Sequence, residues 1–187
     1  MRREPSMGGA RPQPPMRWRD PCRRERRPPG RLRLRAGGRP MIRRIDHIGL
    51  VSNSWEEARD VLLGKLGFPI AEWKGAGETG QYFKPERTMN YFLQVGEGET
   101  VIEIIVPQDD TSGAARFLAK RGPGLHHIGY AVDDVEEEAA RLVAQGLRRI
   151  DLGPRAGAAF FYPQDVHGVL TEFVPFRTPG VRVHTQG

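Results

Sequence analysis

Two stretches of the chain share one pattern of apolar and polar positions. RIDHIGLVSNSWEEARDVL begins at Arg44 and GLHHIGYAVDDVEEEAARL begins at Gly124, and the two align without a gap at an offset of 80 residues. Each begins with an alternation typical of a strand and continues with apolar residues at helical spacing. The repeat therefore indicates two copies of one supersecondary unit.

The second half of each copy predicts a helix with a defined start. Ser54 and Glu57 form a capping box, and Asp134 with Glu137 is its acidic counterpart. Apolar residues then recur at helical spacing, namely Trp55, Ala58, Leu62 and Leu66 in the first copy and Val135, Ala139, Leu142 and Val143 in the second. One face of each helix is thus expected to pack on a sheet.

Three strands are expected after each helix. They are PIAEWK (69–74), TMNYFLQV (88–95) and TVIEIIV (100–106) in the first copy, and RRIDLG (148–153), AAFFYP (158–163) and GVLTEFV (168–174) in the second. We therefore predict an α+β fold of two paired βαβββ modules, which bury their apolar sheet faces against each other. The modules span 41–107 and 125–178, and the linker 108–124 contains a short helix.

Charge separates the first 40 residues from the rest. Residues 1–40 hold 13 arginines, three acidic residues and 8 of the 16 prolines, whereas the remainder has 16 basic and 20 acidic residues. The segment has too few aliphatic residues to form a core, so we interpret 1–40 as a disordered extension, or as the product of a start codon assigned too early, with Met41 as the alternative. Residues 179–187 are interpreted as a flexible C-terminus.

The remaining composition is that of a soluble globular protein. The chain is 38% hydrophobic and 28% charged, and it has no run of 18 apolar residues. Cys22 is the only cysteine, which excludes an internal disulfide framework and suits a reducing compartment. A cytoplasmic protein that does not contact a membrane is expected. The acidic folded part makes nucleic acid an unlikely partner, although the arginine-rich arm alone favours one.

A glutamate interrupts an apolar strand in each copy. Glu103 lies in VIEIIV and Glu172 in VLTEFV, and each shares its strand face with apolar residues two positions away on both sides. An unpaired buried carboxylate costs several kcal/mol unless it is protonated, paired or bound to a metal ion. The two carboxylates are therefore candidates for a buried site.

Each copy also places a histidine on its first strand. The repeat supplies two imidazoles and two carboxylates, from His47, Glu103, His127 and Glu172. This donor set suits one divalent ion, Co, Mn, Ni, Zn or Fe(II), and leaves two positions of an octahedral ion for substrate or water. A single histidine or glutamate in a strand is more often a packing residue, but the recurrence at matching places favours a metal site.

His126 is the neighbour of one candidate ligand. Its counterpart in the first copy is Asp46, so this position does not require a histidine. Strand alternation predicts that His126 points away from His127. We interpret it as a structural residue or as a support for His127.

The motifs together resemble the vicinal oxygen chelate superfamily, which includes glyoxalase I, extradiol dioxygenases and methylmalonyl-CoA epimerase. IDHIGL, ARFLAKRGPGLHHIGYAVDDVEEEAARL, GPR and HGVLTEF are most similar to the epimerases. The resemblance implies a cupped mixed sheet around one metal ion, held by His47, Glu103, His127 and Glu172, and a homodimer that binds an acyl-CoA thioester.

The resemblance also implies an activity. Epimerases of methylmalonyl-CoA-type thioesters carry out a 1,1-proton transfer through a metal-stabilised enolate, and the resemblance places Glu172 as the catalytic base. It further implies a second glutamate on the strand before the GEGE turn. This sequence has Asn90 at about that position, with Glu86 and Tyr91 nearby.

Two other functions remain open at this point. A glyoxalase I-like lyase or isomerase, or another enzyme of the superfamily, can use the same ligands. Extradiol dioxygenases use two histidines and one glutamate, so Glu103 is a surplus carboxylate that argues against oxygenation. A non-catalytic protein that sequesters a small molecule is the third possibility, and Asn90 in place of a second base favours it.

Overall fold

Two βαβββ units, joined by a short helix, build one mixed sheet. The computed structural model describes residues 42–153 and 157–177. The first unit contains β1 (Ile42–Val51), α1 (Trp55–Arg59), a π-helical turn (Asp60–Lys65), a 3₁₀ turn (Glu72–Lys74), β2 (Gln81–Phe83), β3 (Thr88–Gln94) and β4 (Val101–Pro107). After α2 (Gly113–Arg121), the second unit contains β5 (Gly124–Val132), α3 (Val135–Ala144), β6 (Arg149–Ile150), β7 (Ala159–Phe161), a 3₁₀ turn (Pro163–Asp165) and β8 (Leu170–Pro175). The predicted α+β class is confirmed.

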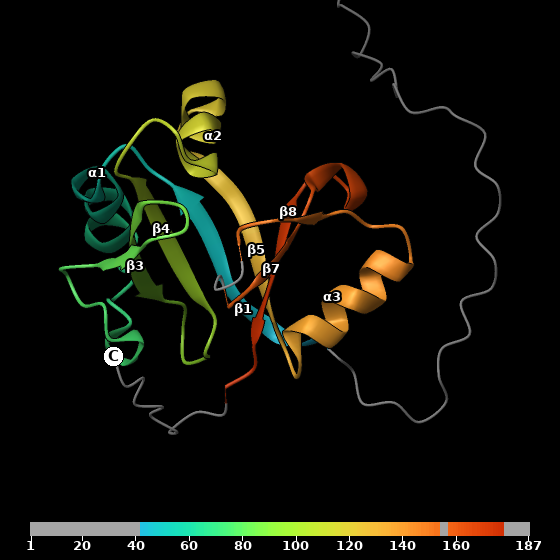
Figure 1. Ribbon diagram of the computed structural model, residues 1–187. Coiled ribbons are helices and arrows are strands. Elements are labelled where there is room, and N and C mark those ends of the chain that lie inside the picture. The colour runs from blue at the N-terminus through green and yellow to red at the C-terminus, as the bar shows by residue number, and fades with distance from the viewer. Residues whose placement is uncertain (1–41, 154–156, 178–187) are drawn as a thin grey trace, which may run out of the picture. The chain divides into compact units, whose positions relative to one another are not determined.

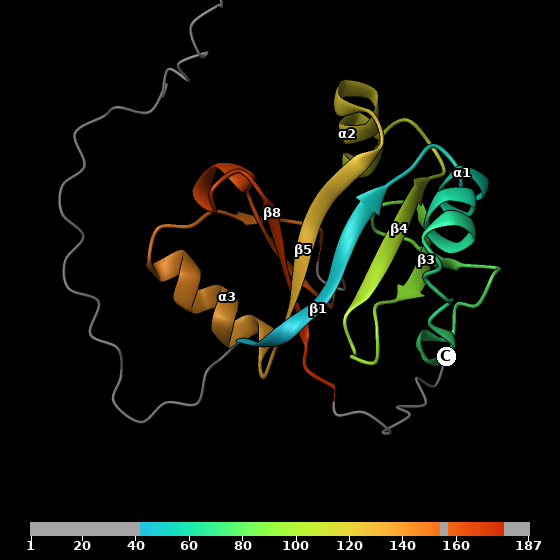
Figure 2. The same cartoon turned by 180° about the vertical axis from the view of Figure 1, so that it is seen from behind.

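The first strands of the two units lie together at the centre of the sheet. The strand order is β2-β3-β4-β1-β5-β8-β7-β6. β1 and β5 pair antiparallel, and each also pairs parallel with the last strand of its own unit, β4 or β8 (Figure 2). The four strands that carry the predicted ligands are therefore consecutive in the sheet.

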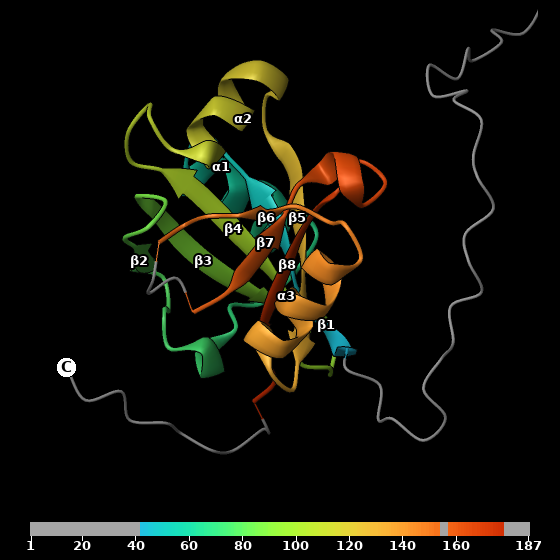
Figure 3. The same ribbon diagram turned by 45° about the vertical axis from the view of Figure 1, so that its right-hand side comes forward.

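The helices pack in two different ways (Figure 1). α1 packs on the outer face, where Trp55 contacts Leu93 and Ile104, and α3 packs through Ala139 on the outer face of the second unit. α2 instead packs on Val51, on the opposite face of the sheet. The sheet curls, so that β7 and β8 pass in front of β3 and β4 in Figure 3. The inner face of this curl holds the candidate ligands.

Both predicted helix caps are confirmed. The side chain of Ser54 accepts a hydrogen bond from the backbone N–H of Glu57, and Asp134 does the same for Glu137. Leu66, the last residue of the predicted packing face of the first helix, does not pack on the sheet, because the chain forms a π-helical turn before it. The wider turn shifts the helical register, and Leu66 is 63% exposed.

The prediction of a strand at 69–74 is wrong. This segment forms one isolated bridge at Ile70 and then the 3₁₀ turn Glu72–Lys74, which ends at Gly75 with a positive φ of 78°. The edge strand of this unit is β2 instead, which begins seven residues after Lys74. The predictions for 1–40 and 179–187 lie outside the described residues. Within the described residues, every helix is too short or too polar to cross a bilayer.

Candidate metal centre

The register of the sheet places the four predicted ligands in two adjacent rows. In one row Glu103 of β4 and His127 of β5 lie on either side of Gly49 of β1. In the other row His47 of β1 and Glu172 of β8 lie on either side of Gly129 of β5. The two rows are related by the internal repeat, because each contains one glutamate, one glycine and one histidine in corresponding positions.

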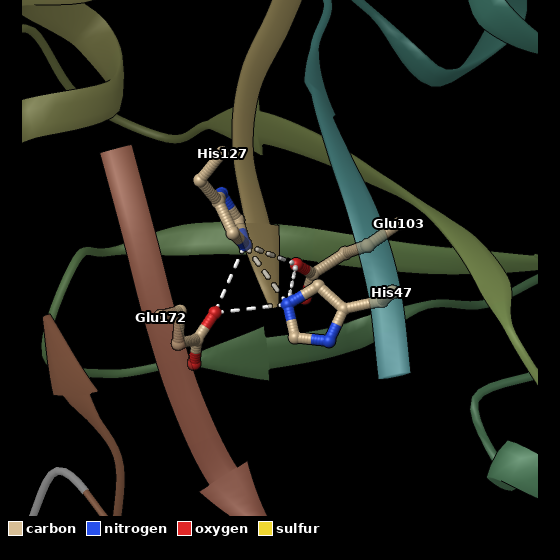
Figure 4. A group of neighbouring side chains, drawn as sticks. All are labelled: His47, Glu103, His127 and Glu172. Atoms are coloured by element: carbon tan, nitrogen blue, oxygen red, sulfur yellow. Dashed lines mark hydrogen bonds and ion pairs between the residues drawn. The ribbon is translucent and has the colours of Figure 1, made fainter. Parts of the chain in front are cut away.

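All four side chains are buried and point toward one another (Figure 4). His47 Nε2 lies 2.9 Å from His127 Nε2, and Glu172 Oε2 lies 2.8 and 2.9 Å from these two nitrogens. Glu103 Oε2 lies 3.5 and 3.4 Å from the same nitrogens. One donor atom from each residue lies within 4.8 Å of every other.

These spacings fit a single cation. Ligand atoms about 2.1 Å from a metal ion are about 3.0 Å apart at right angles and about 3.4 Å apart at tetrahedral angles. The five measured spacings run from 2.8 to 3.5 Å. Two carboxylates and two neutral imidazoles also carry two negative charges, which match a divalent ion. The structure therefore brings together a donor set that can hold one.

The two glycines make room for the imidazole rings. A Cβ atom on Gly129 would lie 2.2 Å from Cε1 of His47, and a Cβ atom on Gly49 would lie 2.2 Å from Cε1 of His127. Each ring thus lies over the glycine of the other repeat. Sequence reasoning missed this role, although the signal was present as the HIG triplet that occurs in both copies.

A β-bulge precedes each ligand histidine. In β1 the pairing passes from Ile45 to His47 and skips Asp46, and in β5 it skips His126. An extra residue of this kind redirects the neighbouring side chains. The prediction that His126 points away from His127 is therefore wrong, since their Nδ1 atoms are 3.0 Å apart.

The bulged residues orient the imidazoles. Asp46 Oδ1 lies 3.1 Å from Nδ1 of His47 and also pairs with the Lys74 ammonium at 3.0 Å. An Nδ1–H that donates to a carboxylate leaves the lone pair of Nε2 directed into the donor cluster. His126 acts in the same way on His127 if His126 is neutral, with a lone pair on Nδ1. Burial and the neighbouring His127 lower the pKa of His126 to about 4, which keeps it neutral at pH 7.

Without a cation, protons balance the charge of the cluster. Burial alone would lower the pKa of His47. The charge of Glu103 and the hydrogen bonds to Asp46 and Glu172 together outweigh burial and raise this pKa to about 10. Burial alone would raise the pKa of both glutamates. The two imidazoles outweigh burial and lower these pKa values, so the carboxylates remain ionised. A metal ion and the imidazolium protons therefore compete for the same nitrogens.

Three residues considered as a second base lie in different surroundings. Asn90 of β3 is buried and its Nδ2 donates a 2.8 Å hydrogen bond to Oε1 of Glu103. Glu86 accepts a 2.8 Å hydrogen bond from the backbone N–H of Gly113, at the start of α2. Tyr91 stacks on Trp55 with ring centroids 4.3 Å apart, on the outer face of the sheet. Tyr91 is therefore on the wrong face for this role.

The sequence matches the model of a known family. The Glyoxalase/Bleomycin resistance protein/Dioxygenase superfamily model matches residues 46–162, which include three of the four candidate ligands. The chain belongs to this superfamily. Membership confirms the resemblance read from the motifs, and the curled eight-stranded sheet is the fold that its structural neighbours share.

Individual relatives include epimerases. An uncharacterized protein of Bacillus subtilis, YqjC, is 32% identical over 70% of this chain and 91% of its own length. The mitochondrial methylmalonyl-CoA epimerase of Dictyostelium discoideum is 30% identical over 72% of this chain and 80% of its own. A Streptomyces coelicolor methylmalonyl-CoA epimerase variant in complex with 2-nitronate-propionyl-CoA is a structural neighbour, with a TM-score of 0.63 and 26% identity over 72% of this chain and 97% of that chain.

Proposed function

We propose that this protein is a metal-dependent isomerase that epimerises a methylmalonyl-type acyl-CoA thioester. One observation carries the proposal: two imidazoles and two carboxylates converge on the inner face of the sheet, with one donor atom of each within 4.8 Å of the others. The similarity to epimerases, one of them in complex with an acyl-CoA compound, supports this substrate class.

The proposed reaction begins with the removal of the α-proton of the thioester, which is a weak acid. The α-proton of a thioester is far less acidic than a free carboxylic acid, so a carboxylate alone cannot remove it at a useful rate. The bound divalent ion would be held by His47, Glu103, His127 and Glu172 and would supply Lewis-acid stabilisation of the negative charge that develops on the thioester oxygen. The remaining work falls to the side chains around it.

Glu172 is the proposed base. It is buried, ionised and hydrogen-bonded through Oε2 to both imidazoles. Burial removes water that would compete for the proton, and the second oxygen of the same carboxylate can accept it. Asp46 and His126 contact Nδ1 of the two imidazoles, so that each Nε2 points into the donor cluster, where a metal ion would take the place of its proton.

Proton exchange tests the proposal without requiring a complete turnover. The protein is stripped of metal, reloaded with Co²⁺ or Mn²⁺, and incubated in deuterated water with methylmalonyl-CoA. We expect the α-proton signal to disappear with the loaded protein and to persist with the stripped protein. No exchange with either metal, in protein shown to contain one ion per chain, would contradict the epimerase proposal.

The second candidate function is a glyoxalase I-like lyase. Glu103 is consistent with it, because its Oε2 lies in the donor cluster and would supply a fourth ligand, one more than the two histidines and one glutamate of a dioxygenase. The same metal-loaded preparation is given the hemithioacetal of methylglyoxal and glutathione. Turnover of this compound, with no exchange in methylmalonyl-CoA, would select the lyase.

A further inference from the structure

The two carboxylates of the centre differ in the partner of their second oxygen. Glu103 directs Oε2 toward the imidazoles, and its Oε1 accepts the 2.8 Å hydrogen bond from Nδ2 of Asn90. Both oxygens of Glu103 are therefore engaged. Asn90 is only 8% exposed, so water does not compete effectively for this hydrogen bond.

Glu172 has no such partner within residues 42–153 and 157–177. Its Oε2 contacts both imidazoles, and among the described residues no side-chain donor reaches its Oε1. The ladder explains the difference, because Phe92 lies opposite Glu103 just as Phe160 lies opposite Glu172. Counting back two residues from Phe160, the position that corresponds to Asn90 is Ala158, which lies in the bend just before β7 and whose methyl group donates no hydrogen bond.

The orientation of the Asn90 amide is fixed by the charge of Glu103. An ionised carboxylate only accepts hydrogen bonds, so the NH₂ group must face it. This leaves Oδ1 of Asn90 buried and without a partner among the described residues. A valine would fit an interior strand position without this penalty. A residue kept only for packing does not need an amide here, which points to the bond with Glu103 as the reason for Asn90.

We propose that Asn90 is a positioning residue that holds Glu103 as a permanent ligand through Oε2 alone, whereas alanine at 158 leaves Glu172 free to turn and take the proton. The internal repeat thus supplies two equivalent carboxylates, and the residues two positions before their strand partners, Asn90 and Ala158, assign different tasks. This inference deepens the proposed function and rests on it for the role of Glu172. The role of Asn90 in metal binding stands independently.

Metal affinity tests the first half without any substrate. Co²⁺ binding is measured by competition with a chromophoric chelator for wild type, Asn90→Val, Glu103→Ala and the double variant. We expect Asn90→Val to weaken Co²⁺ binding by about 10- to 100-fold and to change the visible Co²⁺ spectrum. In the Glu103→Ala background the same substitution should have little further effect, because Asn90 acts through Glu103.

Two results would overturn this half. One is an Asn90→Val protein that binds Co²⁺ as tightly as wild type. The other is an equal loss in both backgrounds, which would show that Asn90 acts on the fold and not on Glu103. The melting temperature of each stripped variant is also recorded. A general loss of structure would lower this temperature for Asn90→Val in the Glu103→Ala background as well as in wild type.

The reciprocal substitution tests the second half. Ala158→Asn introduces an amide at the position that corresponds to Asn90, to offer Oε1 of Glu172 a donor, and Ala158→Val is the control of similar size without a donor. We expect Ala158→Asn to slow α-proton exchange by about 10-fold or more relative to Ala158→Val, with Co²⁺ affinity retained. Equal exchange rates in these two variants would contradict the division of tasks. If wild type itself exchanges no proton, the proposed function fails, while the Co²⁺ measurements still decide the role of Asn90.

Discussion

Replacing Gly129 by alanine should displace the imidazole of His47, one of the four candidate metal ligands. The added Cβ would lie 2.2 Å from Cε1 and 2.5 Å from Nε2 of His47. Ordinary van der Waals contact begins at 3.4 Å, so the ring must move by more than about 1 Å, or the strands must separate. Either movement takes Nε2 of His47 out of the donor cluster, although the ligand itself is unchanged.

The sign of the stability change distinguishes this reasoning from an ordinary glycine effect. In a strand with free space, alanine in place of glycine stabilises a protein by about 0.4–1 kcal/mol, because it restricts the unfolded chain. Overpacking of a buried position costs about 1–3 kcal/mol instead. Loss of one ligand should also weaken Co²⁺ binding by on the order of 100-fold or more, since even residues outside the ligand set affect metal affinity by about 10- to 100-fold.

Chemical denaturation and Co²⁺ titration of the same preparation measure both quantities. Gly64→Ala is the matched control, because its Cβ would meet nothing closer than 3.7 Å and should leave metal binding unchanged. Gly49→Ala should behave like Gly129→Ala, through His127. A Gly129→Ala protein that is more stable than wild type and binds Co²⁺ normally would show that the ring does not depend on the glycine.

Three further outcomes are expected. Glu172→Gln should abolish most α-proton exchange, because the amide cannot take a proton, while Co²⁺ binding falls less than in Glu172→Ala; exchange near the wild-type rate would remove Glu172 as the base. Asp46→Asn should weaken Co²⁺ binding by about 10- to 100-fold, since the Nδ1–H of His47 then donates to a neutral amide oxygen in place of a carboxylate, and equal affinity would contradict that contact. The pKa of His47 is raised to about 10 in the stripped protein, so its stability contribution is present below pH 6.5 and is lost as the pH rises toward 10; melting temperatures that stay constant over this range would contradict the raised pKa.

The sequence was sufficient for the fold class and for the order of most elements because the fold is duplicated. Each helix cap had its own local signal, and Ser54 and Asp134 both form the predicted hydrogen bonds. Glu103 was recognisable because a carboxylate in an apolar strand contradicts the surrounding pattern, and a second one recurs at Glu172. The structure brings these two together with the paired histidines, as the pattern indicated.

The failures are local and have physical causes. Residues 71–74 alternate apolar and polar side chains as a strand does, but Glu72–Lys74 forms a 3₁₀ turn that places Lys74 against Asp46. The contact between His126 and His127 was mispredicted because alternation holds only in a regular strand, and a bulge depends on the pairing register of two strands. The hydrogen bond of Asn90 likewise depends on which residue lies diagonally opposite on the neighbouring strand, and strand register is not visible in one sequence.

The interlocked rows explain why the centre depends on both modules. The first module supplies Glu103 and Gly49 to a row that needs His127 of the second, and the other row reverses this arrangement. If the β1–β5 pairing slipped by one residue, the ligand histidine of one strand would face the other side of the sheet. If it slipped by two, the imidazole of His47 would lose the space above Gly129 and meet a residue with a side chain. The two glycines therefore do more than leave space: they make the correct register of the central strands the one in which both rings fit.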